Sequence, residues 1–275
     1  SCLTEQPAYP CRGCFCEEAF ADSSLQVSGL LMYGASVNKK NGQNQTHGLR
    51  LYAPPAADAR TQRPAVIVLH GGGFAHGNRD QPDIIPQARR FARHGLVAAS
   101  IDYRQECETS RSCPVGYLAA NTDAMEDARA AVRFLVAHAA ELRIDPHRIV
   151  AYGESAGGMV AAYMPSVPGD GSGGSPSFPS NISAAIALSG SLSPPMYKYI
   201  SPEQPPYLDI HGTADGTVPF ATAQATHEAM DKAGARNGLV AIEHAGHIPH
   251  AQLGDARLPF QKDLFGFLEL YAGFS

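Results

Sequence analysis

Short apolar runs alternate along the chain with longer stretches in which apolar residues recur at helical spacing. The short runs predict buried strands at residues 65–69, 96–101, 148–152, 182–188, 207–210 and 238–243. The longer stretches predict helices at residues 82–94, 119–141, 155–164, 221–233 and 258–271. Strands that alternate with helices build βαβ units, so this order predicts the α/β class: a mainly parallel central sheet with helices on both faces.

The flanking segments have a different character. Residues 25–37 and 47–53 alternate polar and apolar positions and are predicted to be edge strands. Residues 168–180 are rich in Gly, Ser and Pro, which favours an exposed, flexible loop. Residues 190–206 lie where a lid would be inserted, but the segment is short, so we expect a small cap or none. With 275 residues, the chain suits a cysteine-rich leader at 1–24 and a single domain at 25–275.

The cysteines and sequons bear on the compartment. The even number of cysteines favours disulfides, and the candidates are Cys2, Cys11, Cys14, Cys16, Cys107 and Cys113. Zinc binding by the Cys-x-x-Cys at 11–14 is disfavoured, because no second ligand pair follows at finger spacing. Asn44 and Asn181 begin sequons and are candidate glycosylation sites. Together these features predict a secreted or lumenal protein, and the start at Ser1 suggests a mature or trimmed chain.

The charge balance excludes some partners. The chain has 21 basic and 26 acidic residues, and its net charge of -5 gives no reason to expect a nucleic-acid partner. We expect no membrane span, because no apolar run reaches about 18 residues. The sequence gives no indication of the oligomeric state.

Residues 153–157, which read Gly-Glu-Ser-Ala-Gly, match the G-x-S-x-G pattern of a nucleophile elbow. In such an elbow a strand enters a helix through a very tight turn, so the neighbours of the serine must be small. The hydroxyl of Ser155 then stands at a helix N-terminus, where the helix dipole favours developing negative charge. An apolar strand directly before and a helix directly after support this interpretation over a chance Gly-Ser turn.

Residues 70–73, which read His-Gly-Gly-Gly, follow an earlier predicted strand. Glycines there allow backbone N–H groups to approach a ligand oxygen, so Gly72, Gly73 and Ala156 are the candidate donors of an oxyanion hole. A phosphate-binding loop is disfavoured because no Lys-Ser/Thr pair follows the glycines. His70 itself is expected to orient its neighbours rather than to act as a base.

A serine hydroxyl needs a base, and the order nucleophile, acid, histidine indicates where to look. Asp215, just after a predicted strand, is the candidate acid, with Asp209 inside that strand as its rival. His247, on a glycine-containing loop after the last strand, is the candidate base. His244 and His250 are the other candidates and are expected to be solvated loop histidines.

In combination, these segments resemble the α/β-hydrolase superfamily, and more narrowly the HGGG-containing esterase/lipase group near hormone-sensitive lipase and the feruloyl-esterase-like proteins. The matching segments are residues 70–74, 101–104, 144–149 and 153–158, with Asp215, Val218-Pro219 and His247. The resemblance runs from about residue 47 to the end. It implies hydrolysis of carboxylic esters through an acyl-serine intermediate, with a small-molecule ester as the substrate and without metal or cofactor.

Two departures from the family pattern affect the substrate prediction. There is no room for a large N-terminal helical cap, and residues 105–107 read Gln-Glu-Cys instead of Leu-Ala-Pro. We expect short-acyl or small aromatic esters. The candidate pocket walls are Tyr103, Tyr117, Met196 and Tyr197, although ordinary core or loop packing explains each of them equally well. The alternatives are a polyester- or cutin-type enzyme, a peptidase-type hydrolase, and a non-catalytic binding module of the same fold.

Overall fold

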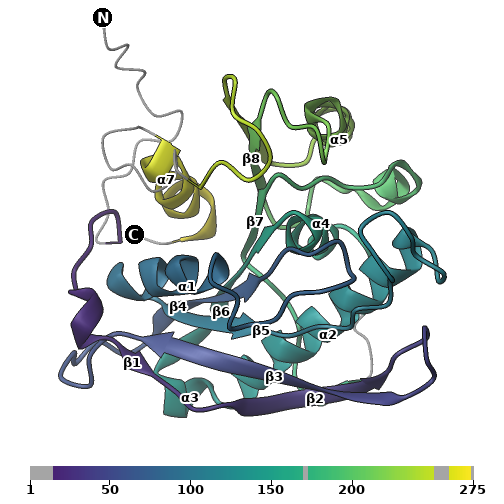
Figure 1. The fold of residues 1–275 in the computed structure, drawn as a ribbon. Coiled ribbons are helices and arrows are strands. Elements are labelled where there is room, and N and C mark those ends of the chain that lie inside the picture. The colour runs from purple at the N-terminus through teal and green to yellow at the C-terminus, as the bar shows by residue number, and fades with distance from the viewer. Residues whose placement is uncertain (1–14, 170–172, 251–259, 274–275) are drawn as a thin grey trace, which may run out of the picture.

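The computed structural model describes residues 15–169, 173–250 and 260–273, and its central element is a nine-stranded sheet (Figure 1). The strands are β1 (Gln26–Val27), β2 (Leu31–Val37), β3 (Asn44–Ala53), β4 (Arg63–Leu69), β5 (Val97–Ile101), β6 (Ile144–Glu154), β7 (Ala184–Leu188), β8 (Tyr207–Gly212) and β9 (Asn237–Ile242). The helices are α1 (Ile84–Arg93), α2 (Tyr117–Ala137), α3 (Ala139–Leu142), α4 (Ala156–Tyr163), α5 (Phe220–Ala233) and α7 (Phe260–Ala272). Two 3-10 helices are η1 (Asp22–Ser24) and η2 (Pro194–Tyr199).

The strand order across the sheet is β1-β3-β5-β4-β6-β7-β8-β9, with β2 paired to β3. All pairs from β5 to β9 are parallel, whereas β3 pairs antiparallel with β1, β2 and β5. The mainly parallel sheet predicted from the sequence is therefore confirmed, with the alternating segments forming an antiparallel edge.

The parallel strands are buried because helices cover both faces of the sheet. Every residue of β4, β5 and β7 is buried, as expected for strands that read as continuous apolar runs. Apolar residues of α2 and α4 join one core cluster, and those of α1 and α7 join the other (Figure 1). None of the described helices combines the length and apolar character that a membrane crossing needs.

The fold places the candidate chemistry at one edge of the sheet. In parallel strands the carboxyl ends lie on the same side, and the loops after β4, β6, β8 and β9 carry His70, Ser155, Asp215 and His247 respectively. This is the edge at which open α/β sheets bind their ligands. The segment after β7 contains only the short η2, which fits the expectation of a small cap.

The described part of the predicted loop at residues 168–180 is mostly exposed, as expected, but it is attached to the domain at one point. In the described part of residues 168–180, the guanidinium of Arg133 donates hydrogen bonds of 3.1 and 2.6 Å to the carbonyl oxygen of Gly173. A side chain at Gly174 would meet the backbone oxygen of Tyr33 at 2.9 Å. Residues 173–174 therefore lie between α2 and β2, where the carbonyl oxygen of Gly173 serves as an acceptor for buried Arg133.

The predicted leader lies mostly outside the described residues, and so do Cys2, Cys11 and Cys14. The predicted boundary between 1–24 and 25–275 stays a prediction. The sulfur atoms of Cys107 and Cys113 are 2.02 Å apart, which is disulfide-bonding distance. Asn44 and Asn181 are both exposed.

Candidate active site

Ser155 occupies the turn between β6 and α4 with φ 53° and ψ -116°, a conformation that L residues rarely adopt. The turn is as tight as the sequence pattern predicts. A Cβ on Gly153 would lie 2.0 Å from the oxygen of Gly157, and a Cβ on Gly157 would lie 2.3 Å from the oxygen of Leu69. Both glycines are therefore required by backbone contacts within the elbow.

Three segments bring Ser155, His247 and Asp215 into one hydrogen-bonded chain. Nε2 of His247 is 2.9 Å from Oγ of Ser155, and Nδ1 of His247 is 2.7 Å from Oδ2 of Asp215. With Nδ1–H donating to the carboxylate, Nε2 is free to accept the serine proton. The arrangement can deprotonate a hydroxyl and stabilise the imidazolium that results.

The carboxyl group of Asp215 is held by further donors. Its Oδ1 accepts hydrogen bonds from the backbone N–H groups of Thr217 and Val218, at 2.8 and 3.0 Å. Burial acts to raise the pKa of Asp215, but the hydrogen bonds from His247 and these two N–H groups prevail and lower it. Asp215 therefore remains ionised beside His247, as an orienting acid requires.

The rival acid, Asp209, lies elsewhere. It is fully buried in β8, and its Oδ2 is 3.4 Å from Nδ1 of His211. Nε2 of His211 is 2.8 Å from the carbonyl oxygen of Val218 and 3.2 Å from Oδ2 of Asp215. Burial acts to lower the pKa of His211, but Asp209, Val218 and Asp215 outweigh it and raise the pKa. Asp209 thus contacts His211, which lies beside Asp215, and it makes no contact with His247.

The glycine loop after β4 lies beside the nucleophile. A Cβ on Gly71 would be 3.4 Å from Cβ of Ser155, and Gly72 and Gly73 have φ values of 119° and 63°, which favour glycine. Ala156 is the first residue of α4, so its N–H has no acceptor within the helix. Gly72, Gly73 and Ala156 all line the cavity that contains Ser155, which is where oxyanion donors must be.

His70 is buried behind this loop. Its Nδ1 is 2.6 Å from the carbonyl oxygen of Gly71, and its ring stacks on Tyr103 with 4.3 Å between centroids. Burial lowers the pKa of His70. The ring therefore supports the glycine loop and does not reach the nucleophile, in line with the predicted orienting role.

The cavity around Ser155 has a volume of about 370 Å³. Of the candidate wall residues, only Tyr117 lines it. Tyr103 is 1% exposed and packs against His70, while Met196 and Tyr197 lie in η2 and pack against the core. The prediction was wrong for those three side chains, because position along the chain does not reveal which face of a loop meets the cavity.

One prediction about the other histidines was also wrong. His244 is exposed as expected, but His250 is half-buried and its Nε2 lies 2.8 Å from Oε1 of Glu154. Glu154, next to the nucleophile, is fully buried and also accepts a hydrogen bond from Tyr152. His250 is therefore a partner of the elbow and not a solvated loop residue, since a buried carboxylate needs a donor.

The segment between Cys107 and Cys113 also reaches the site. Ser110 lines the cavity, and a Cβ on Gly73 would lie 2.7 Å from Cβ of Ser110. The N–H of Cys107 donates to the carbonyl oxygen of Phe74 at 2.9 Å. Sequence reasoning found the small loop but not its place against the glycine loop, and the departure at residues 105–107 was the signal.

Sequence reasoning also missed Gln81 and Asp83, which line the cavity just before α1. Gln81 directly precedes the helix predicted at residues 82–94 and Asp83 lies in its first turn, so neither suggested more than a helix start. Among the described residues, no group of three or more His, Cys, Asp or Glu side chains is arranged to hold a metal ion.

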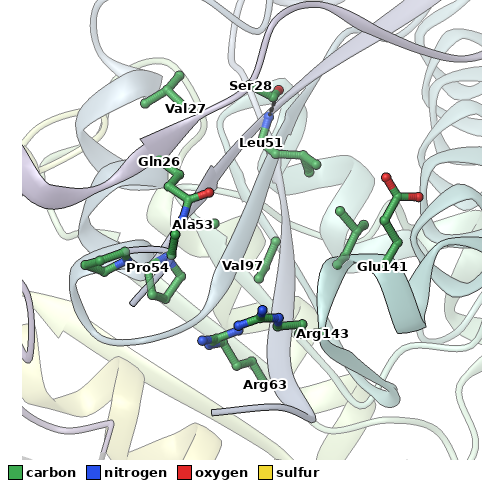
Figure 2. A pocket seen from close by; sticks show the side chains of 13 residues that line it. Gln26, Val27, Ser28, Leu51, Ala53, Pro54, Arg63, Val97, Glu141 and Arg143 are labelled. Atoms are coloured by element: carbon green, nitrogen blue, oxygen red, sulfur yellow. Dashed lines mark hydrogen bonds between the residues drawn. The ribbon is translucent and has the colours of Figure 1, made fainter. Parts of the chain in front are cut away.

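Figure 2 shows a second hollow, of about 360 Å³, at the opposite edge of the sheet. Its lining includes Arg63 and Val97, which begin β4 and β5, whereas Ser155 follows the end of the neighbouring strand β6. It holds none of the candidate catalytic residues. The chemistry described above therefore belongs to the cavity at the carboxyl edge.

Two family models match the chain. The BD-FAE model matches residues 49–170, and the Phospholipase/Carboxylesterase model matches residues 118–257, just over half of the chain. Among curated proteins, Carboxylesterase NlhH of Mycobacterium tuberculosis (strain CDC 1551 / Oshkosh) is 36% identical over 116 residues, covering 42% of this chain and 32% of that protein. Ethyl acetate hydrolase of Pseudomonas putida is 31% identical over 151 residues, covering 53% of this chain and 43% of that protein. The matched region thus spans about a third of the length of NlhH.

Solved structures match over most of their length. Esterase 2 of Thermogutta terrifontis with butyrate bound is 33% identical, with a TM-score of 0.69, covering 87% of this chain and 94% of that one. The same esterase phosphorylated by paraoxon is 32% identical, with a TM-score of 0.70, and the match covers 92% of this chain and 96% of that one. The predicted α/β-hydrolase fold is therefore confirmed.

Proposed function

Because the chain belongs to the carboxylesterase group of the α/β-hydrolases, we propose that it hydrolyses carboxylic esters through an acyl-serine intermediate on Ser155. The observation that carries the proposal is the position of His247, which bridges Oγ of Ser155 and the carboxylate of Asp215. Nucleophile, base and orienting acid come from three separate loops and meet within hydrogen-bonding distance.

In the first half-reaction, Nε2 of His247 takes the proton of Ser155 as Oγ attacks the ester carbonyl carbon. The carbonyl oxygen becomes an oxyanion, which accepts hydrogen bonds from the N–H groups of Gly72, Gly73 and Ala156. Asp215 stabilises the imidazolium. The intermediate then collapses, the bond to the alkoxy oxygen breaks, and His247 protonates the departing alcohol.

In the second half-reaction, His247 takes a proton from water, which attacks the acyl-serine carbonyl. The same N–H groups hold the second oxyanion, and the proton returns to Oγ of Ser155 as the carboxylic acid leaves. Since each step uses only side chains, backbone donors and water, the residues account for the reaction without a metal or cofactor.

The size of the cavity favours small substrates. A space of about 370 Å³ suits a short acyl chain or a small aromatic ring better than a long lipid chain. The related esterase structures contain butyrate and propionate, which are short acids. We therefore assign short-acyl or small aromatic esters as the substrate class.

We further propose a secreted or lumenal location. Cys107 and Cys113 would then form a stable disulfide, because thiols are oxidised in such compartments. The exposed side chains of Asn44 and Asn181 would be accessible to glycosylation. Mass spectrometry of the protein from its native source, with and without reduction and deglycosylation, tests both modifications.

Replacement of the nucleophile tests the proposed function. We expect Ser155→Ala to lower kcat for p-nitrophenyl acetate by more than about 1,000-fold and to abolish labelling by a fluorophosphonate probe. Ser24→Ala, on the exposed η1, is the matched control and should keep both properties. Undiminished turnover by Ser155→Ala would refute the assignment.

A further inference from the structure

Two arginine side chains lie together at one side of the second hollow, the one shown in Figure 2. The backbone N–H of Arg63 donates to the carbonyl oxygen of Arg143 at 3.0 Å, so the two residues are direct neighbours. Their guanidinium groups also meet, because both donate to the carbonyl oxygen of Asp58, at 2.9 and 3.3 Å. Positive charge is thus concentrated at one side of the hollow.

The charges of this cluster are only partly balanced. The carboxylate of Asp58 pairs with Arg63 at 3.0 Å, but it also pairs with Arg60 at 3.0 Å. Within the described part of the chain, Arg143 forms no ion pair, and its guanidinium donates to a neutral carbonyl oxygen. Glu141 lines the hollow as well, yet Figure 2 shows its carboxylate pointing away from the arginines. Three guanidinium groups against two carboxylates leave one positive charge in excess, which complements a monoanion.

The backbone of Arg143 supports a functional role for its side chain. Arg143 directly follows α3 and has φ 55° and ψ 36°, the left-handed conformation, at the position where helices most often have glycine. Any residue with a side chain is strained in this conformation. An exposed arginine that is held in a strained conformation and has no carboxylate partner is a candidate for binding a ligand.

The other sides of the hollow are largely apolar. The apolar lining residues are Val27, Leu51, Ala53, Pro54, Val97 and Leu142. Gln26 adds a side-chain amide, which can donate a hydrogen bond. The volume of about 360 Å³ suits a small organic molecule, whereas an inorganic ion would leave most of it unfilled. The lining therefore combines positive charge on one side with apolar surface on the others.

We propose that the second hollow binds a small organic carboxylate, with its charged group on Arg143 and Arg63 and its hydrocarbon part against the apolar walls. Guanidinium groups bind carboxylates through charge-assisted hydrogen bonds. Arg143 provides the main contact, because it is exposed, whereas Arg63 is buried and already paired with Asp58. The hollow lies at the edge of the sheet opposite Ser155, so this site does not depend on the proposed ester hydrolysis.

NMR titration of methyl-labelled protein with benzoate tests the proposal, because the two cavities have different reporters. The methyl resonances of Val97 and Leu142 report on the second hollow, whereas those of Val218 and Ile248 report on the cavity around Ser155. We expect benzoate to shift the resonances of Val97 and Leu142 saturably. Benzamide, which has the same shape without the charge, should bind at least about tenfold more weakly. Inorganic phosphate, which has charge without an apolar part, should also bind more weakly than benzoate.

The variant Arg143→Gln should weaken benzoate binding at least about tenfold, because it removes the exposed charge. Arg236→Gln is the matched control, since Arg236 is also exposed but does not line the hollow, and it should keep the wild-type affinity. Neither residue lines the cavity around Ser155, so kcat for p-nitrophenyl acetate should be unchanged in both variants. Thermal unfolding checks that the fold is retained.

Several results would overturn the inference. Shifts confined to Val218 and Ile248, or no saturable shift of Val97 and Leu142, would mean that benzoate does not occupy the second hollow. Equal affinity for benzamide, or full affinity in Arg143→Gln, would mean that the charge is not recognised. Phosphate that binds as tightly as benzoate would mean that the apolar walls contribute nothing. All of these results leave the proposed ester hydrolysis in place, because they concern the opposite edge of the sheet.

Discussion

Replacing Asp215 by Asn tests the geometry of the site most directly, because it exchanges one carboxylate oxygen for an amide NH₂ group and preserves the shape. In the wild type, Oδ1 accepts from two backbone N–H groups while Oδ2 faces Nδ1 of His247 at 2.7 Å. The substitution Asp215→Asn removes the charge and turns one oxygen into an N–H donor.

The backbone hydrogen bonds determine which carboxylate oxygen of Asp215 the amide NH₂ group replaces. The N–H groups of Thr217 and Val218 both require an acceptor, so the amide oxygen of Asn must take the place of Oδ1. Its NH₂ group then faces His247 and forces Nδ1 to become the acceptor. The imidazole proton moves to Nε2, which can no longer accept the proton of Ser155.

The expected decrease in kcat follows because the substitution prevents His247 from acting as a base and leaves the fold intact. Forcing this tautomer in a serine-histidine-acid site lowers kcat by roughly 1,000- to 10,000-fold, or about 4 to 5 kcal/mol in the barrier. KM should change little, because Asp215 does not line the cavity.

Steady-state kinetics with p-nitrophenyl acetate measures this effect, and thermal unfolding checks the fold. Asp209→Asn is the comparison, since Asp209 contacts His211 rather than His247. We expect it to lower kcat far less than Asp215→Asn. A kcat within tenfold of wild type for Asp215→Asn, or a larger loss for Asp209→Asn, would refute the assignment of the acid.

Two further predictions concern groups beside the site. Burial raises the pKa of Glu106 to about 7. As the pH rises, the unfolded chain therefore loses the carboxyl proton near pH 4.5, whereas the folded protein keeps it until about pH 7. The free energy of unfolding falls over this range. Glu106→Gln, which carries no charge at any pH, should abolish up to about 3 kcal/mol of that fall in urea unfolding measured at several pH values; an unchanged pH profile would contradict this. Cys107→Ser/Cys113→Ser should lower kcat about tenfold with little change in KM, because the loop packs on Gly73. Wild-type protein reduced with dithiothreitol should show the same loss of kcat as the double variant. An unchanged kcat after reduction would contradict this prediction.

The parts predicted from the sequence share a local cause. Apolar runs and helical spacing mark strands and helices, and the alternation of the two determines a parallel sheet. The elbow needs small residues at 153 and 157 because backbone atoms approach within 2.0–2.3 Å of where side chains would be. Requirements of this kind are visible in a short stretch of sequence.

The parts that were missed depend on contacts between distant segments. Ser110 lines the cavity only because its loop folds back on Gly73, and Asp83 only because α1 starts beside the glycine loop. Neither residue has a distinctive neighbourhood in the sequence.

The contact between Glu154 and His250 shows that the geometry of the catalytic residues also depends on such contacts between distant segments. The G-x-S-x-G pattern treats position 154 as variable, yet here it holds a fully buried carboxyl group whose pKa is raised by burial, against the hydrogen bond from His250. The histidine loop is thus attached to the elbow at two neighbouring residues, through His247 to Ser155 and through His250 to Glu154. The contact between His250 and Glu154 at one end of this loop restricts the position of the imidazole three residues away. The distance of 2.9 Å between base and nucleophile is therefore supported by a residue that the motif leaves unspecified.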